Sequence, residues 1–185
     1  MLNKIKYLLT YRYSEIIHDL TIEFCRKYIN YHSRTKDQME QAARSGKQNI
    51  VEGIAQSPTS LKGEIKLLGV AKASLEELLA DYEDYLRQHS LVIYPKTDPK
   101  ITSFRRLAFK LSHLSNLSNL GNLIIKPKLP GNPTDDANFL LTLCHQATYL
   151  LDRQIKATEE KFITTGGFTE QLFQKRLSYR NNYNN

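Results

Sequence analysis

Cysteine, tryptophan and methionine are scarce in this chain, which has two cysteines, no tryptophan and two methionines among its 185 residues. Both cysteines, Cys25 and Cys144, lie in segments whose apolar residues recur at helical spacing. A free cysteine in such a segment behaves as a small buried hydrophobe. We therefore expect two buried thiols and no disulfide framework.

Long apolar runs are also missing, since no stretch approaches the roughly 18 apolar residues of a membrane-spanning helix. The N-terminal segment MLNKIKYLLTYRY lacks the apolar stretch and the small-residue cleavage site of a signal peptide. Hydrophobic residues make up 41% of the chain and charged residues 24%, which is ordinary for a globular protein. We expect one domain with a substantial core, located in the cytoplasm.

Acidic residues are depleted in two parts of the chain, whose net charge is +7. Residues 1–36 contain seven Lys or Arg against three Asp or Glu, and residues 91–134 contain seven against one. Residues 37–90 contain six against nine, and residues 135–185 contain six of each. Segregated basic charge favours a polyanionic partner, and the competing interpretation is a solvated surface.

Four long segments have apolar residues at three- and four-residue spacing and are predicted to be helices. The first runs from Tyr11 or Ser14 to Tyr31, and the second from Thr35 or Asp37 to the residue before Ser57-Pro58. The third follows an N-cap at Ser60 and ends near His89. The fourth follows an N-cap at Thr134 and ends at Gly166-Gly167.

The second helix has an unusually small apolar face. Gly46 and Gly53 would each cost roughly 1 kcal/mol relative to alanine in a helix interior, so packing is expected to compensate. Small side chains allow a neighbouring helix to approach closely. The face consists of Met39, Ala42, Ala43, Gly46, Ile50, Gly53 and Ile54.

Five of the six prolines lie between residues 95 and 133, where the helical pattern is interrupted. Within this insertion, a shorter helix is expected from Ile101 to about Leu117. Its continuation LSHLSNLSNLGNL has leucine at every third position, a period that drifts around an α-helix, so the tract is expected to fray or tighten. A short final helix is expected from Thr169 to about Tyr179, followed by a disordered Asn-rich end.

Together these elements predict an all-α fold. The expected architecture is an antiparallel up-and-down four-helix bundle with an inserted short helix between the third and fourth helices and a short C-terminal suffix helix. The bundle would comprise residues 1–165, with the proline-rich insertion at about 91–133. Residues 166–185 would form the suffix helix and tail.

Patterns for catalysis and metal binding are incomplete. A di-iron bundle needs Glu-x-x-His on two helices, and here only Glu15 and His18 have that spacing, so an ordinary helix-face pairing is favoured. No Cys-x-x-Cys motif occurs, and Ser45-Gly46-Lys47 lacks the flanking residues of a phosphate-binding loop. We expect no enzyme activity, no metal and no cofactor.

Two polar groups on these helices have alternative interpretations. Asn49 and Glu52 are expected to make a buried contact that sets helix register, and the alternative is an interface between subunits. A run of carboxylates has no accompanying base or nucleophile, so a solvated surface is favoured over acid–base catalysis. This run comprises Glu76, Glu77, Asp81, Glu83 and Asp84.

Candidate nucleic-acid-binding residues come from the basic segments. Tyrosines interleave with the first group and could stack on exposed bases, although tyrosine at helical spacing is more often core or interface. The tyrosines are Tyr11, Tyr13, Tyr28 and Tyr31. The basic candidates are Arg26, Lys27, Arg34, Arg44 and Lys47, followed by Arg105, Arg106, Lys110, Lys126 and Lys128.

The segment QAARSGKQNIVEG, the Ser/Thr-rich turn after it and EIKLLGVAKASLEELL resemble the four-helix-bundle family of 23S ribosomal RNA intervening-sequence proteins. That family includes the accessory variability determinant of diversity-generating retroelements. The run HQATYLLDRQIKATEEKFITTGGF resembles the longer branch with a C-terminal suffix region. The matching features are Ala42-Ala43, Ser45, Asn49-Ile50, Glu52-Gly53, Ala71, Ser74-Leu75 and Glu77-Leu78.

This resemblance implies a homo-oligomer, typically a pentamer, with a basic surface for RNA or DNA. In the retroelement branch it also implies a partner reverse transcriptase. The leading hypothesis is thus a non-enzymatic, oligomeric accessory protein that binds nucleic acid and has no membrane partner. The alternative is a structural or protein-interaction module whose charge serves solubility alone.

Overall fold

The computed structural model describes residues 5–114 and 127–183, and their regular secondary structure is entirely helical. The core-forming helices begin and end close to the predicted positions. The bounds are α2 Leu9–Tyr28, α3 Arg34–Gln56, α4 Leu61–Gln88, α5 Pro99–Leu114, α6 Pro133–Thr165 and α7 Phe168–Tyr183.

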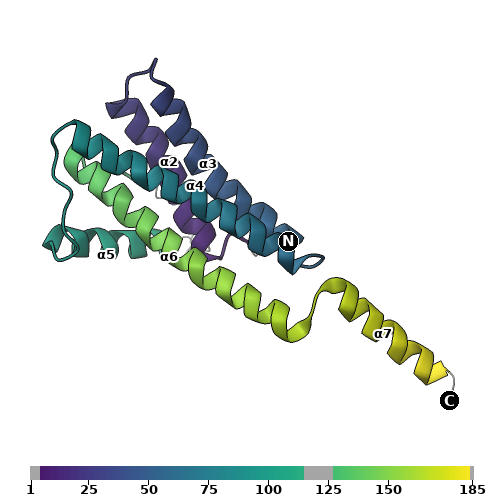
Figure 1. Cartoon of the computed structure of the whole chain (residues 1–185). Coiled ribbons are helices and arrows are strands. Elements are labelled where there is room, and N and C mark those ends of the chain that lie inside the picture. The colour runs from purple at the N-terminus through teal and green to yellow at the C-terminus, as the bar shows by residue number, and fades with distance from the viewer. Residues whose placement is uncertain (1–4, 115–126, 184–185) are drawn as a thin grey trace, which may run out of the picture.

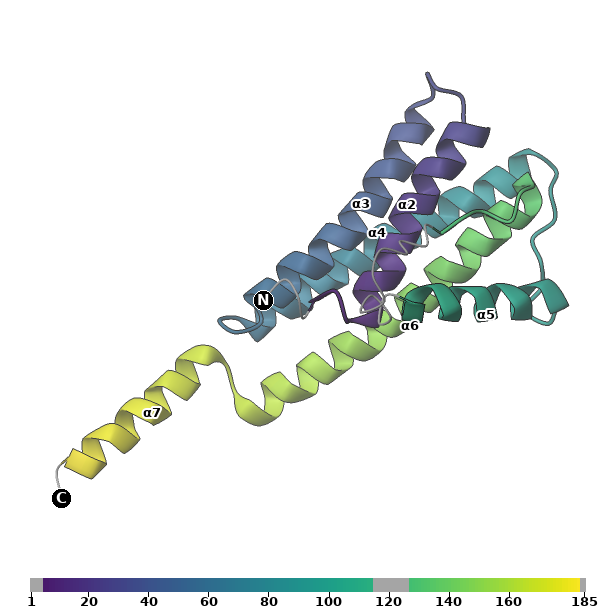
Figure 2. The same ribbon diagram turned by 180° about the vertical axis from the view of Figure 1, so that it is seen from behind.

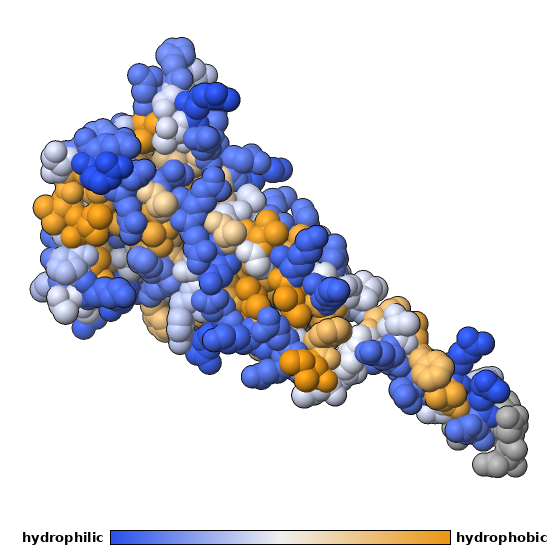
Figure 3. All heavy atoms as spheres, in the orientation of Figure 1, coloured by the Kyte–Doolittle hydropathy of each residue, from blue (hydrophilic) through white to orange (hydrophobic). Residues whose placement is uncertain are grey.

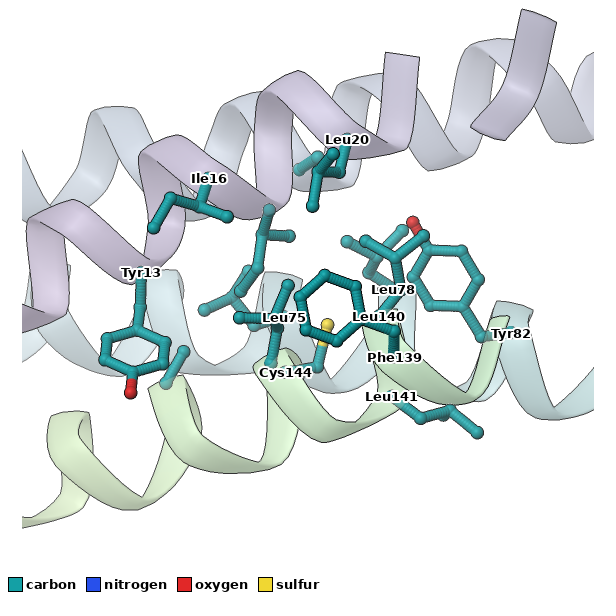
Figure 4. Packing of buried hydrophobic residues seen from close by; sticks show 14 of the residues in the cluster. Tyr13, Ile16, Leu20, Leu75, Leu78, Tyr82, Phe139, Leu140, Leu141 and Cys144 are labelled. Carbon is teal, nitrogen blue, oxygen red and sulfur yellow. The ribbon is translucent and has the colours of Figure 1, made fainter. Parts of the chain in front are cut away.

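Four helices, α2, α3, α4 and α6, pack side by side around one hydrophobic core (Figure 1). Short connections at 29–33 and 57–60 join α2 to α3 and α3 to α4. Leucines of α4 and aromatic residues of α4 and α6 meet in the interior (Figure 4). Among the fully buried side chains are Phe24, Leu75, Leu78, Tyr82, Phe139 and Leu140.

Side-chain caps account for the starts of three helices. The Oγ of Ser33 accepts a hydrogen bond from the N–H of Thr35, and the Oγ of Ser60 accepts one from the N–H of Gly63. The predicted cap at Thr134 was wrong: Asn132 caps α6, because Pro133 already occupies the first helical turn. Gly166 ends α6 with φ of +68°, as predicted for a glycine at that position.

The small face of the second helix does bring α3 close to α4. A Cβ atom at Gly46 would lie 2.7 Å from Cδ2 of Leu75, and one at Gly53 would lie 3.3 Å from Cβ of Leu67. Both distances are shorter than ordinary carbon contacts. The helix-packing prediction is therefore confirmed, and both cysteines are buried free thiols as expected.

Two helices lie outside this group of four. Helix α5 packs against α6 and α2, and Nη1 of Arg12 donates to the carbonyl oxygen of Ser112 at 2.7 Å. Helix α5 begins two residues before the predicted start, and the rest of the leucine tract, 115–123, lies outside the described residues. Helix α7 projects away from the body and is longer than predicted at both ends (Figures 1 and 2).

Candidate nucleic-acid interface

The basic residues of α2 and α3 differ in how available they are. Arg26, Arg34 and Arg44 have exposed side chains. The Nζ of Lys27 instead lies 2.6 Å from a carboxylate oxygen of Glu23, one turn earlier in α2. An exposed pair of this kind adds little stability but neutralises the cation locally. Three arginines therefore remain as the accessible cations of this predicted group.

Lys47 is held between α2 and α3 rather than projecting into solvent. Its Nζ lies 3.2 Å from Nδ1 of His18. Burial lowers the pKa of His18, and the positive charge of Lys47 lowers it further, whereas Asp19 opposes both effects. A neutral imidazole can accept a hydrogen bond from the ammonium group. Lys47 thus has a structural partner that the sequence pattern did not indicate.

The second predicted group lies on α5. Arg105, Arg106 and Lys110 are all exposed, and the helix has no acidic residue from Pro99 to Leu114. Arg106 and Lys110 are four residues apart and therefore lie next to each other on the helix surface. Helix α5 consequently presents cations with no carboxylate of its own to neutralise them.

An aromatic ring accompanies these cations. Phe109 is 60% exposed and stacks on the ring of His113, with 3.9 Å between the ring centroids. Its position beside Lys110 and one turn after Arg106 places an apolar ring within a basic surface, an arrangement suited to nucleic-acid bases. We call Arg106, Phe109, Lys110 and His113 the α5 surface. Sequence reasoning missed Phe109, although its place one residue after buried Ala108 puts it off the buried side of α5.

Arg105 points toward a different neighbourhood. Together with Lys96 it contributes positive charge near His145 of α6, whose pKa is lowered chiefly by burial; Glu83 opposes that shift. Lys128 is exposed, and Lys126 lies outside the described residues. The structure therefore does not join the predicted cations into one surface: some lie on α2 and α3, which pack together, and others on α5, which does not pack on α3.

Most of the candidate stacking tyrosines are engaged within the fold. Tyr13 is buried, and the hydroxyl of Tyr28 donates to Oδ2 of Asp136 at 2.8 Å. Tyr11 donates to Glu15 at 2.9 Å. Only Tyr31 of the four is largely exposed, at 79%, and Nζ of Lys36 lies 5.6 Å from its ring centroid. The core-or-interface interpretation is confirmed for Tyr13.

No metal-binding cluster of three or more His, Cys, Asp or Glu occurs within residues 5–114 and 127–183. Glu15 accepts a hydrogen bond from Tyr11, whereas His18 faces Lys47, so the Glu-x-x-His pair is divided between two contacts. In the same ranges, no helix has both the length and the apolar character needed to cross a bilayer.

Asn49 makes its contacts inside α3. Its Nδ2 donates to the carbonyl oxygen of Ser45 at 2.9 Å, and the hydroxyl of Ser45 lies 2.9 Å from that of Ser74 on α4. This chain of contacts links α3 to α4 and favours the structural interpretation of Asn49. Glu52 is exposed, so it does not share in that contact.

The carboxylate run on α4 is mostly solvated, with one exception. Glu76, Glu77, Glu83 and Asp84 are exposed, but Asp81 is half-buried and its Oδ2 has no hydrogen-bond partner. Burial raises the pKa of Asp81 to about 6, and the negative charges of Glu77 and Asp84 raise it in the same direction. Two members of the run have cation partners on α4: Lys72 lies 3.4 Å from Glu76, and Arg87 lies 2.7 Å from Asp84.

Comparison with known proteins adds no further assignment: no family model matches this chain, and no curated protein or solved structure matches it either.

Proposed function

We propose that this chain is a non-enzymatic, homo-oligomeric accessory protein that binds RNA or DNA through its basic surfaces. The observation that supports it best is the α5 surface, where exposed Arg106 and Lys110 flank the exposed ring of Phe109 on an acid-free helix. Phosphates would bind the cations, and an unpaired base would stack on the ring. Arg26, Arg34 and Arg44 would supply a second set of backbone contacts.

The resemblance to the intervening-sequence family extends this proposal. We propose that α2, α3, α4 and α6 form an antiparallel up-and-down four-helix bundle and that copies of this bundle assemble, typically as a pentamer. In the retroelement branch of that family the partner is a reverse transcriptase, and we include such an enzyme among the proposed partners. The proposed location is the cytoplasm.

Binding through the α5 surface would depend strongly on salt. Each phosphate neutralised releases counterions, so affinity should fall steeply as salt rises, with little sequence preference. The test is fluorescence anisotropy of labelled single-stranded RNA and DNA across a salt series. The reversal R106E/K110E should abolish binding at moderate salt and flatten the salt dependence.

A matched control separates local charge from total charge. K62E/K66E makes the same change in net charge on α4, where both lysines are exposed, and should retain most of the binding. Phe109→Ala should weaken binding to single strands by about 1–3 kcal/mol and leave duplex binding almost unchanged. Absence of RNA and DNA binding by the unaltered chain even at low salt would refute the proposal.

The second candidate function is a protein-interaction module. Two features favour it, because neither suits a phosphate backbone. One is the carboxylate run of α4, where Oδ2 of Asp81 has no hydrogen-bond partner, and the other is the set of exposed apolar side chains on α7. In this case R106E/K110E would leave partner binding intact. Co-purification of the reversed variant with an unchanged protein partner would favour this function over the first.

A further inference from the structure

The last turns of α6 and the whole of α7 form a projecting arm, which we define as residues 159–183. In Figures 1 and 2 the arm extends beyond the ends of the other helices. Figure 3 shows apolar side chains along it among hydrophilic ones. The exposed large apolar residues of the arm are Phe162, Ile163, Phe168, Leu172, Phe173 and Tyr179.

Such an arm is poorly stabilised by itself. Helix α7 has 16 residues and packs on no other helix to a significant extent. Isolated helices of about this length are marginal in water, and most helical stability in proteins comes from packing of an apolar face. The exposed rings of Phe168 and Phe173 are therefore available to pack against a partner surface.

The arm is also cationic. Helix α7 contains Lys175, Arg176 and Arg180 against a single acidic residue, Glu170. Glu170 already receives a hydrogen bond from the N–H of Gly167 at the start of the helix. The three cations thus lie toward the free end of the arm, beyond the apolar side chains of Phe168 and Leu172.

A complementary surface exists on α4. Glu77, Asp81 and Asp84 recur at spacings of four and three and lie on one side of the helix. Asp84 also pairs with Arg87 at 2.7 Å, an exposed pair that an arriving cation would share. Glu77 also borders an open groove between α3 and α4, of about 510 Å³. Its charged lining residues are Glu77, Asp37 and Arg34, so carboxylates outnumber cations there by two to one. Val70, which is 42% exposed, and exposed Ala73 precede the acidic residues along the same helix.

We propose that α7 of one copy docks along the groove between α3 and α4 of a second copy. The cations of the arm lie against Glu77, Asp81 and Asp84, and its apolar side chains cover Val70 and Ala73. This inference rests on the proposed self-association and names the surfaces that carry it. It also gives the acidic part of the chain a role separate from nucleic-acid binding.

The lengths of the two elements agree. At a rise of 1.5 Å per residue, the 16 residues of α7 span about 24 Å, and the stretch from Val70 to Asp84 spans about 21 Å. Asp81 lies within that stretch, and cations placed beside it would offset the repulsion from Glu77 and Asp84.

The cations of the arm cannot reach the carboxylates of this surface on their own chain. Nζ of Lys72 lies 2.7 Å from Oδ1 of Asp152, which sets α4 and α6 in register. Asp81 lies about 13 Å beyond Lys72, and Gly166 lies about 21 Å beyond Asp152 in the opposite direction. A fold-back at Gly166 would have to span about 34 Å, whereas Arg180 is only about 21 Å along α7.

The test uses charge reversal and rescue in the full chain. The arm variant K175E/R176E/R180E and the acceptor variant E77K/D84K are measured separately and mixed, by analytical ultracentrifugation with circular dichroism as the folding check. Each variant alone should self-associate at least about tenfold more weakly than the unaltered chain, because like charges then meet. An equimolar mixture should regain association between the two variants. K62E/K66E serves as the control, and the mass of its assembly should equal that of the unaltered chain.

Deletion of residues 168–183 keeps the inference testable if the acceptor variant does not fold, because α7 adds little to the packing of the other helices. The deletion should weaken association as much as the arm variant does. Unchanged association in the arm variant and the deletion would overturn the inference and leave the proposed oligomer standing. A monomeric unaltered chain would overturn both, while binding through the α5 surface is measured independently. Loss of RNA or DNA binding in the arm variant with unchanged mass would assign the arm to nucleic acid and also overturn the inference.

Discussion

Gly46 of α3 lies directly against the buried side chain of Leu75 of α4. A Cβ atom at Gly46 would approach Cδ2 of Leu75 to 2.7 Å, and the backbone carbonyl of Ala71 lies 3.6 Å away. Gly69, also within a helix, has no atom within 4 Å of the corresponding position. Two helical glycines in one chain therefore differ in whether packing requires them.

This contrast gives a stability prediction. Gly46→Leu should lower the free energy of unfolding by about 1–3 kcal/mol, because the added side chain overpacks the contact between α3 and α4. Gly69→Ala should raise it by about 0.5–1 kcal/mol, because only helix propensity changes at an open position. Urea unfolding followed by circular dichroism measures both. Equal effects of the two substitutions would contradict the close contact.

A second prediction concerns the buried carboxylate of Asp136. It accepts hydrogen bonds from the hydroxyl of Tyr28 at 2.8 Å and from the N–H of Gly131 at 2.6 Å. Asp136→Ala should destabilise the protein by about 2–4 kcal/mol, because it leaves two donors without an acceptor. Tyr28→Phe removes one bond and should cost about 1–2 kcal/mol. Thermal unfolding of both variants provides the comparison. A larger loss of stability in Tyr28→Phe than in Asp136→Ala would contradict the prediction.

Asp81 gives a pH-dependent prediction. Burial first, and then Glu77 and Asp84, raise its pKa from 3.8 to about 6 in the folded chain. The folded state thus holds the proton of Asp81 more tightly than the unfolded state does. The contribution of this proton to folding stability is complete below pH 3.8 and is lost as pH rises through about 6. Asp81→Asn should therefore stabilise the protein above that pH by about 1 kcal/mol, a modest value because solvent screens the half-buried group.

The measurement is urea unfolding of Asp81→Asn and the unaltered chain at a series of pH values. The difference between them should shrink as pH falls toward the unfolded pKa. Glu52→Gln is the control, since Glu52 is exposed and lies outside the carboxylate run. A stabilisation by Asp81→Asn that does not change with pH would argue against the raised pKa.

His18 gives a prediction that can be read directly by NMR. Burial and Lys47 lower its pKa, and Asp19 raises it. Lys47→Met should therefore move the pKa upward, and Asp19→Asn should move it downward. Proton chemical shifts of the His18 ring during a pH titration report both changes. Shifts of the same sign in the two variants would show that the contact with Lys47 is not formed.

Much of the helical architecture is legible from the apolar spacing and the breakers. The bounds of α3, α4 and α6 agree closely with the pattern, because proline before α4 and glycine after α6 interrupt helices by local backbone chemistry. The error at Thr134 arose because Asn132 and Thr134 are both good caps. Pro133 distinguishes them, because proline is favoured at the first helical position and so indicates Asn132 as the cap.

The candidate interface was less predictable. Local sequence marked Arg106 and Lys110 as cations, and the helical period through Phe104 and Ala108 was an unused signal that Phe109 lies off the buried side of α5. Local sequence could not show that Lys47 faces His18, a contact between residues 29 positions apart. Such pairings depend on how helices are rotated against one another.

The sequence by itself determined which segments are helical and where the acidic residues are scarce, since periodicity, capping residues and composition are local properties of the chain. Only the tertiary structure decided which polar groups are exposed. Packing of α3 on α4 buries the small face around Gly46, leaves Oδ2 of Asp81 without a partner and separates the cations of α3 from those of α5. Burial and contact are set by segments far apart in the chain, which no local pattern contains.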